Sequence, residues 1–155
     1  MRAWDASRRA LIVLPGLLWG EQQLGAQVAA LPLSRDLGSE LASAVQRRQP
    51  LLVLVSLHAC VYCERVRRSY LLPMLAQGQA VVQIDMHSQT GVRDFQSVAT
   101  VHEEVVRRWR VQLAPTVLFF GPGGREVAER MEGTYQPDFY GAYLEDRLKQ
   151  ARQRL

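Results

Sequence analysis

The feature that most constrains this chain is an uninterrupted apolar run that ends at a closely spaced pair of cysteines. Six of the seven residues from Leu51 to Leu57 are apolar, and neither Gly nor Pro interrupts them. A run of this kind is typical of a strand buried on both faces of a sheet. Two residues later a CxxC sequence begins at Cys60, and the charged run 64–68 that follows it suits a helix. The pattern therefore predicts a core strand, a short turn and a helix that carries the cysteines.

A cysteine pair at a strand–helix junction places its first sulfur at the helix N-terminus. The unpaired N–H groups and the helix dipole there favour an anion, so we expect a lowered thiol pKa for Cys60. The two intervening residues, Val61 and Tyr62, complete a first helical turn, which brings Cys63 close enough to form a short disulfide. The spacing indicates redox chemistry.

Two other interpretations of the cysteine pair stay open at this point. A structural zinc site needs about four ligands, and the chain offers only two cysteines and three histidines. His58 precedes Cys60 by two residues, which is not a familiar ligand spacing. The second alternative is an inert structural disulfide. The strand–CxxC–helix context favours a redox-active pair over both, and we predict no metal site.

Length and composition are those of one globular domain. The chain has 155 residues, of which 48% are hydrophobic and 22% charged, with a net charge of +4. This length is sufficient to bury a core without additional cross-links. The basic clusters lie on predicted helices and are interleaved with glutamates and apolar positions, and a single Trp109 among them is not the aromatic interleaving of an RNA-binding surface. We therefore predict solvated helix faces and no nucleic-acid binding.

The first 30 residues resemble an export signal. Three arginines precede the apolar run 10–19, which is too short to span a bilayer, and Val28-Ala29-Ala30 suits a cleavage site. Ser7-Arg8-Arg9 also loosely resembles a twin-arginine signal. An uncleaved anchor and a start codon placed too far upstream are the alternatives. We predict a signal peptide over residues 1–30, a single domain over residues 31–155 and a periplasmic location.

The pattern around the core strand predicts helices on both sides of it. A helix over 34–48, capped by Ser34, has one apolar face, made of Leu37, Leu41, Ala44 and Val45. The helix that carries the cysteines should kink or break near Pro73. Residues 80–86 follow as a second strand, and two strands joined by a helix form a parallel pair.

The segment 87–97 is polar and forms either a surface loop or a small subdomain. Beyond it, residues 98–110 predict a helix whose apolar face is made of Val98, Val101, Val105 and Trp109. His102 lies beside that face, and we interpret it as a packing or surface residue rather than a metal ligand.

The C-terminal part predicts a strand, a hairpin and a last helix. Pro115 precedes the apolar strand 116–120, where it removes no hydrogen bond of the sheet. The glycine-rich residues 121–124 make a turn, and 125–131 return as an antiparallel strand. Pro137 and Asp138 begin the final helix, whose predicted apolar face consists of Phe139, Tyr143, Leu144, Leu148 and Ala151.

This order of elements resembles the thioredoxin fold over residues 34–152. The resemblance rests on the CxxC at the strand–helix junction, on Pro115 before the strand 116–120, and on the glycine-rich hairpin. It implies the α/β class, with a central mixed sheet flanked by helices. The Tyr62-Cys63-Glu64 sequence and the long helix ending near Pro73 most resemble exported thioredoxin-like proteins of bacterial sulfur-oxidation and cytochrome-maturation systems. The Tyr-Cys pair also resembles the catalytic domain of periplasmic disulfide isomerases.

The sequence departs from that of a thioredoxin at three positions. Ala59 replaces a tryptophan, and Leu54 stands in the place of a buried aspartate whose lysine partner would lie near Val81. The proton acceptor that the family uses for its second cysteine is therefore missing. The segment between Asp85 and Pro115 is also longer than in a minimal thioredoxin. These differences separate the chain from cytosolic thioredoxin and leave the predicted fold unchanged.

The resemblance implies a role for each site residue. Cys60 would attack a client disulfide, and the more buried Cys63 would then release the client. Pro115, by resemblance in the cis form, would lie against the sulfurs, and the predicted substrate-binding residues are Val61, Tyr62, Ala114 and Pro115. No bound cofactor is indicated beyond the redox-active cysteine pair.

Two further residues are candidates for adjusting the proton affinity of the cysteines. His58 would favour the Cys60 thiolate when protonated, or would be an exposed bystander. Glu64 would relay a proton for Cys63, or would be a surface residue that stabilises the first helical turn.

We therefore predict a disulfide reductase of the cell envelope. Its expected partners are disulfide-containing exported proteins and a membrane electron donor, and we expect a monomer that binds no nucleic acid. The alternatives are a disulfide oxidase or isomerase of the same fold, and a thioredoxin-like module that binds a metal or a partner protein.

Overall fold

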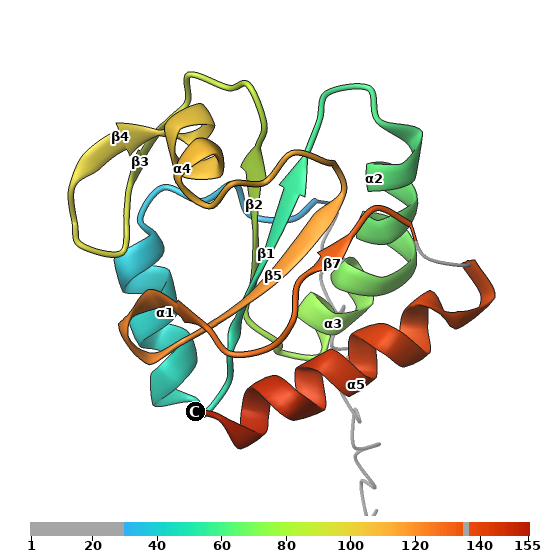
Figure 1. Cartoon of the computed structure of the whole chain (residues 1–155). Coiled ribbons are helices and arrows are strands. Elements are labelled where there is room, and N and C mark those ends of the chain that lie inside the picture. The colour runs from blue at the N-terminus through green and yellow to red at the C-terminus, as the bar shows by residue number, and fades with distance from the viewer. Residues whose placement is uncertain (1–29, 135–136) are drawn as a thin grey trace, which may run out of the picture.

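The computed structural model describes residues 30–134 and 137–155. The predicted signal peptide falls, except for Ala30, outside the described residues. In the described part a mixed sheet lies between two layers of helices, with α1 and α4 on one face and α2, α3 and α5 on the other (Figure 1). None of the helices among residues 30–134 and 137–155 combines the length and the apolar character that crossing a membrane requires.

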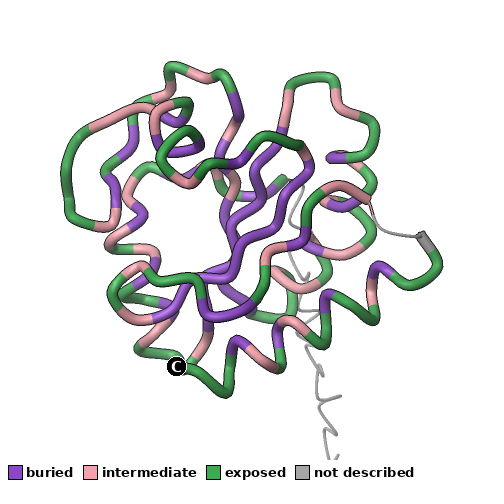
Figure 2. The backbone as a smooth tube through the Cα atoms, in the orientation of Figure 1, coloured by how far each residue is buried: buried purple, intermediate pink, exposed green. Residues whose placement is uncertain are grey.

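The strand predicted from the apolar run is the centre of the sheet. β1 (Leu51–Ser56) pairs in parallel with β2 (Val81–Asp85) and antiparallel with β5 (Thr116–Gly121). β5 in turn pairs with β6 (Arg125–Glu126) and β7 (Met131–Glu132). Every residue of β1 and β5 is buried, as the purple strands in the middle of Figure 2 show. The prediction of a strand covered on both faces is therefore confirmed.

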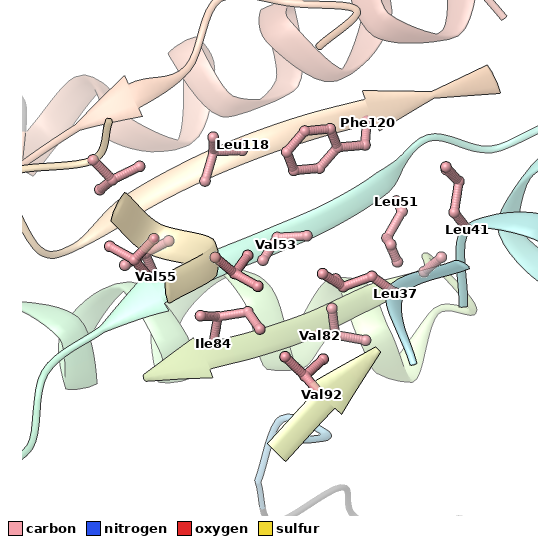
Figure 3. Packing of buried hydrophobic residues seen from close by; sticks show 14 of the residues in the cluster. Leu37, Leu41, Leu51, Val53, Val55, Val82, Ile84, Val92, Leu118 and Phe120 are labelled. Atoms are coloured by element: carbon pink, nitrogen blue, oxygen red, sulfur yellow. The ribbon is translucent and has the colours of Figure 1, made fainter. Parts of the chain in front are cut away.

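Successive residues of β1 point into two separate apolar cores, as the alternation of side chains along a strand requires. Val53 and Val55 belong to the core under α1 (Leu37–Gln46) and α4 (His102–Arg108), which Figure 3 shows from close by. Leu54 belongs to the core on the other face. That core is covered by α2 (Val61–Val66), η1 (Arg67–Leu71), α3 (Leu72–Ala76) and α5 (Tyr140–Gln153).

α1 begins three residues later than the sequence predicts. Its N-cap is Asp36, whose carboxylate accepts the N–H of Ser39 at 2.9 Å. Ser34, the predicted cap, is buried; its backbone N–H donates to the carbonyl of Gln83 and its hydroxyl to Glu40. The predicted cap was wrong because Ser34 lies along the edge of β2. The predicted apolar face of α1 is correct.

The helix that carries the cysteines changes its hydrogen-bond pattern before Pro73. α2 passes into the π-helical segment η1, where the N–H of Leu72 bonds to the carbonyl of Arg67, five residues earlier. Pro73 is near the start of α3 and supplies no N–H of its own. A π-helical insertion of this kind is a recognised cause of helix kinks. The interruption that Pro73 predicts is thus present.

The segment after β2, predicted as a surface loop or a small subdomain, contains a β-hairpin, and the helix that follows is shorter than predicted. β3 (Gly91–Arg93) pairs with β4 (Ala99–Val101), and α4 begins only at His102. The prediction that the helix starts at Val98 and buries it was wrong, since Val98 is exposed. Between the two strands Asp94 accepts the N–H groups of Gln96 and Val98, which makes a turn, and β4 then occupies residues where the apolar spacing indicated a helix.

Aromatic contacts hold the hairpin against the body of the protein. The ring of Phe95 lies 5.9 Å from that of Trp109 and 4.8 Å from that of Phe120. Gly124 faces the same ring so closely that a Cβ there would approach it to 2.7 Å. The hairpin is therefore a packed part of the domain.

The strand predicted over 125–131 is two short strands. Glu126 and Met131 both pair with β5, and the returning chain advances five residues from one to the other. Over the same stretch β5 advances only three residues, so the returning chain has two extra residues. Val127 and Ala128, which lie in this interruption, are both buried. The single strand was therefore a wrong prediction.

The last helix buries a face slightly different from the predicted one. A 3₁₀ turn, η3 (Pro137–Phe139), precedes α5. Phe139 and Tyr143 are exposed, which corrects the prediction for both. The buried face instead consists of Tyr140, Leu144, Leu148 and Ala151. These four residues recur at helical spacing from Tyr140, the first residue of α5. The predicted face differs because the sequence predicted an earlier start of the helix.

Candidate redox site

The cysteine pair lies where the central strand of the sheet passes into α2. After Leu57 the chain turns through Ala59, whose φ of 53° is in the left-handed region. Cys60 is the N-cap of α2, and its sulfur accepts the N–H of Cys63 at 3.1 Å. The two cysteines form a disulfide with a Cα–Cα distance of 5.2 Å. The predicted position at the helix N-terminus and the predicted proximity of the sulfurs are both present.

The two cysteines differ in their accessibility. Cys63 is completely buried, whereas Cys60 is partly exposed. The residues between them point outward, with Val61 at 72% and Tyr62 at 56% exposure. An incoming sulfur can therefore reach Cys60 directly, while Cys63 is shielded from solvent.

Pro115 and its neighbours form one side of the site. Val55 pairs with Thr116, which brings the start of β5 next to the end of β1. The Ala114–Pro115 peptide bond is cis. The Thr116 hydroxyl donates to the carbonyl of Leu113 at 2.6 Å, and Gly133 donates to the carbonyl of Pro115 at 2.7 Å. These bonds fix the backbone around the proline.

The backbone of Ala114 is left available on this side. Its N–H and carbonyl have no hydrogen-bond partner within residues 30–134 and 137–155. Leu113, next to it, is 51% exposed. An unpaired backbone segment beside an exposed apolar side chain is suited to pairing with an extended peptide.

On the opposite side of β1, a chain of polar side chains connects α2 with the ends of both parallel strands. Arg67 donates to the Ser56 hydroxyl at 3.0 Å and, through Nε, to Oε1 of Gln83 at 2.9 Å. The Gln83 amide donates in turn to Oδ1 of Asp85 at 2.6 Å. Arg67 also forms an ion pair with Glu64. We call Ser56, Glu64, Arg67, Gln83 and Asp85 the polar network.

Most of this polar network was not predicted from the sequence. Leu54 and Val81 are buried as expected, so the site has no acid at the position that the family uses. The network lies further along the strands, toward their carboxyl ends. Two signals could have indicated it: Ser56 at the end of an apolar run, and Gln83 inside an otherwise apolar strand.

Glu64 is engaged by two arginines. Its carboxylate accepts hydrogen bonds from Arg68 and Arg67, and those bonds, Arg68's most strongly, hold the pKa of Glu64 below its ordinary value. Glu64 is therefore ionised at neutral pH and occupied on both oxygens. His58 is exposed and has no hydrogen bond or ion pair with the other described residues. For both residues the proposed influence on the cysteines stays a prediction.

His102, the first residue of α4, contacts the end of β2 at Asp85. It is completely buried, its Nδ1 accepts the backbone N–H of Asp85 at 3.1 Å, and its Nε2 faces the carbonyl of Ser34 at 2.9 Å. The packing interpretation of His102 is therefore confirmed. Within the described ranges, no group of three His, Cys, Asp or Glu side chains is arranged to hold a metal ion.

Comparison with known proteins identifies the family. The model of the thioredoxin-like domain family matches residues 37–148, and the chain therefore belongs to that family. The α/β thioredoxin fold expected from the sequence is thereby confirmed. The sequence matches none of the curated proteins with which it was compared.

Solved structures support the same fold at low sequence identity. A thioredoxin-fold protein from Helicobacter pylori is 16% identical, with 69% of this chain and 73% of that chain covered and a TM-score of 0.54. The DsbH oxidoreductase is 15% identical, with 96% and 95% covered and a TM-score of 0.52. At these identities the likeness concerns the fold, and the chain is a member of the thioredoxin-like class that carries a CxxC pair.

Proposed function

We propose that this protein is a thiol–disulfide oxidoreductase of the cell envelope that reduces disulfides in exported proteins. The observation that supports it most directly is the disulfide at the start of α2, with Cys60 partly exposed and Cys63 fully buried. This asymmetry is what a nucleophile and a resolving thiol require.

In the proposed reaction, two electrons pass from the Cys60–Cys63 dithiol to the client disulfide. The Cys60 thiolate attacks one client sulfur and forms a mixed disulfide, and the other client sulfur leaves as a thiolate that takes a proton. Cys63 then attacks Cys60, which releases the second client thiol and restores the protein's disulfide. The Cys63 N–H, 3.1 Å from the Cys60 sulfur, is positioned to stabilise the thiolate.

The client would be held along the proline side of the site. The unpaired backbone of Ala114 would form hydrogen bonds with an extended client, and Val61, Tyr62 and Leu113 would supply apolar contacts. No cofactor beyond the cysteine pair takes part, and the protein acts as a monomer.

The reductive direction rests on the small size of the segment between β2 and α4. A strong oxidant of the related exported class carries a helical domain inserted in the fold, whereas the described chain has only the β3–β4 hairpin between β2 and α4. The envelope location rests on the signal-like residues 1–30. Because an oxidising compartment has no soluble pool of reductant, a membrane electron donor would regenerate the dithiol.

Equilibration with glutathione tests the direction. We expect a reduction potential well below the value of about −120 mV that characterises the strong oxidant DsbA. A potential near that value, together with rapid oxidation of reduced client proteins, would show that the electrons flow the other way.

A trapping variant tests the assignment of the cysteines. Cys63→Ser should accumulate clients joined to Cys60 in non-reducing gels of the envelope fraction, because the resolving thiol is missing. Cys60→Ser is the matched control and should trap none. Equal trapping by both variants would contradict the proposed roles.

A further inference from the structure

A recess of about 990 Å³ opens beside Cys60, on the side away from Pro115. It lies between the residues that follow β1 and those that follow β2, and both segments are at the same end of the sheet (Figure 1). Crevices at the carboxyl ends of parallel strands are common ligand sites in α/β folds. Cys60 and most of the polar network line this recess. Any group bound here would lie next to the reacting sulfur.

The Asp85 carboxylate in the wall of the recess is held in place from two directions. Arg67 fixes the orientation of the Gln83 amide, whose Nε2 then donates to Oδ1 of Asp85. The backbone N–H of Asp85 donates to the buried ring of His102. A carboxylate fixed in advance loses little conformational entropy when a ligand binds to it.

The charges that line the recess leave Asp85 without a counterion. Glu64 and Arg67 form an ion pair with each other. In the described part of the chain the Asp85 carboxylate bonds only to a neutral amide, its Oδ2 has no partner, and no cation lies within ion-pair distance of either oxygen. His87, also in the wall, lies 3.7 Å from Glu103, a further acidic group. The recess is therefore complementary to a cation.

We propose that this recess is a client subsite that takes the lysine or arginine side chain next to the client's reactive cysteine. The inference rests on the proposed function, because the client must be joined to Cys60 in the mixed disulfide. While it is joined, a residue beside the client cysteine lies at the mouth of the recess. A flexible basic side chain is long enough to extend inward and place its charged end on Asp85. Asp85 is thus a specificity-determining residue, and the cis-proline side supplies the sequence-independent contacts.

The test uses three disulfide-closed peptides that differ only beside the cysteine that Cys60 attacks. Lysine, glutamine or glutamate flanks that cysteine on both sides, and reduction by the dithiol form of the protein is followed by stopped flow at low salt. Each rate is divided by the rate of reduction by free dithiothreitol, because neighbouring charges alter the reactivity of the peptide itself. The wild type should favour the lysine peptide over the glutamate peptide by about fivefold, the size expected of a partly exposed ion pair.

Variants of Asp85 connect that preference to the recess. Asp85→Asn should reduce the preference to about one, and Asp85→Lys should invert it. Asp146→Asn, which removes an exposed carboxylate from α5, is the matched control and should keep the wild-type preference.

The outcomes separate the two proposals. If the wild type reduces all three peptides at equal normalised rates, or if Asp85→Asn keeps the preference, the subsite is excluded and the reductase stands. If the dithiol form reduces none of the peptides, the proposed function itself is wrong.

Discussion

The two sides of Cys60 present different chemical groups. On the β5 side, around Pro115, the available groups are the backbone of Ala114 and exposed apolar side chains such as Leu113. On the β2 side they are charged and amide side chains linked to one another, with Arg67 at the centre. One disulfide therefore faces a backbone edge on one side and a charged recess on the other.

Under the proposed function, this difference would separate general recognition of clients from selective recognition. Backbone groups pair with any extended peptide, because every residue except proline carries the same N–H and carbonyl. Charged side chains in a fixed arrangement discriminate among clients. A protein that has both can accept many disulfides and still prefer some of them. Four substitutions test how much the interactions on each side contribute to the free energy of unfolding.

The largest effect is expected from His102→Ala, which removes the support of the β2 side. The backbone N–H of Asp85 and the carbonyl of Ser34 would lose their buried partner, and a cavity would remain. We expect a loss of about 2–4 kcal/mol in the free energy of unfolding, measured with urea. The exposed His87→Ala is the control and should change it by less than about 0.5 kcal/mol. Equal losses in the two variants would mean that the contacts of His102 do not stabilise the β2 side.

Arg67→Met should have the second largest effect. It keeps the packing of the aliphatic stem and removes the guanidinium that joins α2 to the Ser56 hydroxyl and the Gln83 amide. We expect a destabilisation of about 1–3 kcal/mol, because partly buried polar groups lose their partners. Arg65→Met, at an exposed position of the same helix, should be nearly neutral. A neutral Arg67→Met would show that the polar network contributes nothing to stability.

Thr116→Val tests the proline side and should cost about 1 kcal/mol. The substitution keeps the shape of a buried side chain and removes its hydrogen bond to the carbonyl of Leu113. Thr100→Val, whose hydroxyl has only a 3.4 Å contact at an exposed site, is the control. A loss greater than that of Arg67→Met would reverse the order in which we rank the two sides.

The smallest effect concerns the pH dependence of stability. Arg68, and then Arg67, lower the pKa of Glu64 in the folded protein, so ionised Glu64 stabilises the fold above the pKa of the unfolded state. That contribution disappears as the pH falls through the folded pKa. Glu64→Gln should therefore remove a small part of the acid-induced loss of stability, measured by urea unfolding between neutral and acidic pH. Glu145→Gln, without an ion pair in the described ranges, should leave the acid-induced loss as in the wild type.

Much of the fold could be predicted from the sequence because local patterns dominate it. The apolar run 51–57 and the CxxC that follows specify a core strand and a helix start without reference to any distant residue. The predictions failed where local signals conflicted with tertiary contacts. Ser34 is a good cap by type, but pairing with β2 leaves the cap to Asp36. Val98 has helical spacing, but the turn at Asp94 places it in a hairpin.

In the candidate site, too, local sequence patterns predict some features, whereas others arise only when the chain folds. The position of the CxxC pair at the strand–helix junction could be predicted because it depends on a short local spacing. The roles assigned to Cys60, Cys63 and Pro115 stay predictions. The polar network was not found, because its members come from two strands and a helix that are adjacent only in the folded protein.

The sequence by itself determined that the chain has one buried central strand and a cysteine pair at the start of a helix. Hydrophobic periodicity and a two-residue spacing are local properties, and physical chemistry interprets them without a fold. Only the tertiary structure decided what surrounds that pair. The parallel register of β1 and β2 places Ser56 beside Asp85, and the start of η1 brings Arg67 into contact with both strands. Side-chain hydrogen bonds depend on positions within a fraction of an ångström, and packing of the whole chain sets those positions.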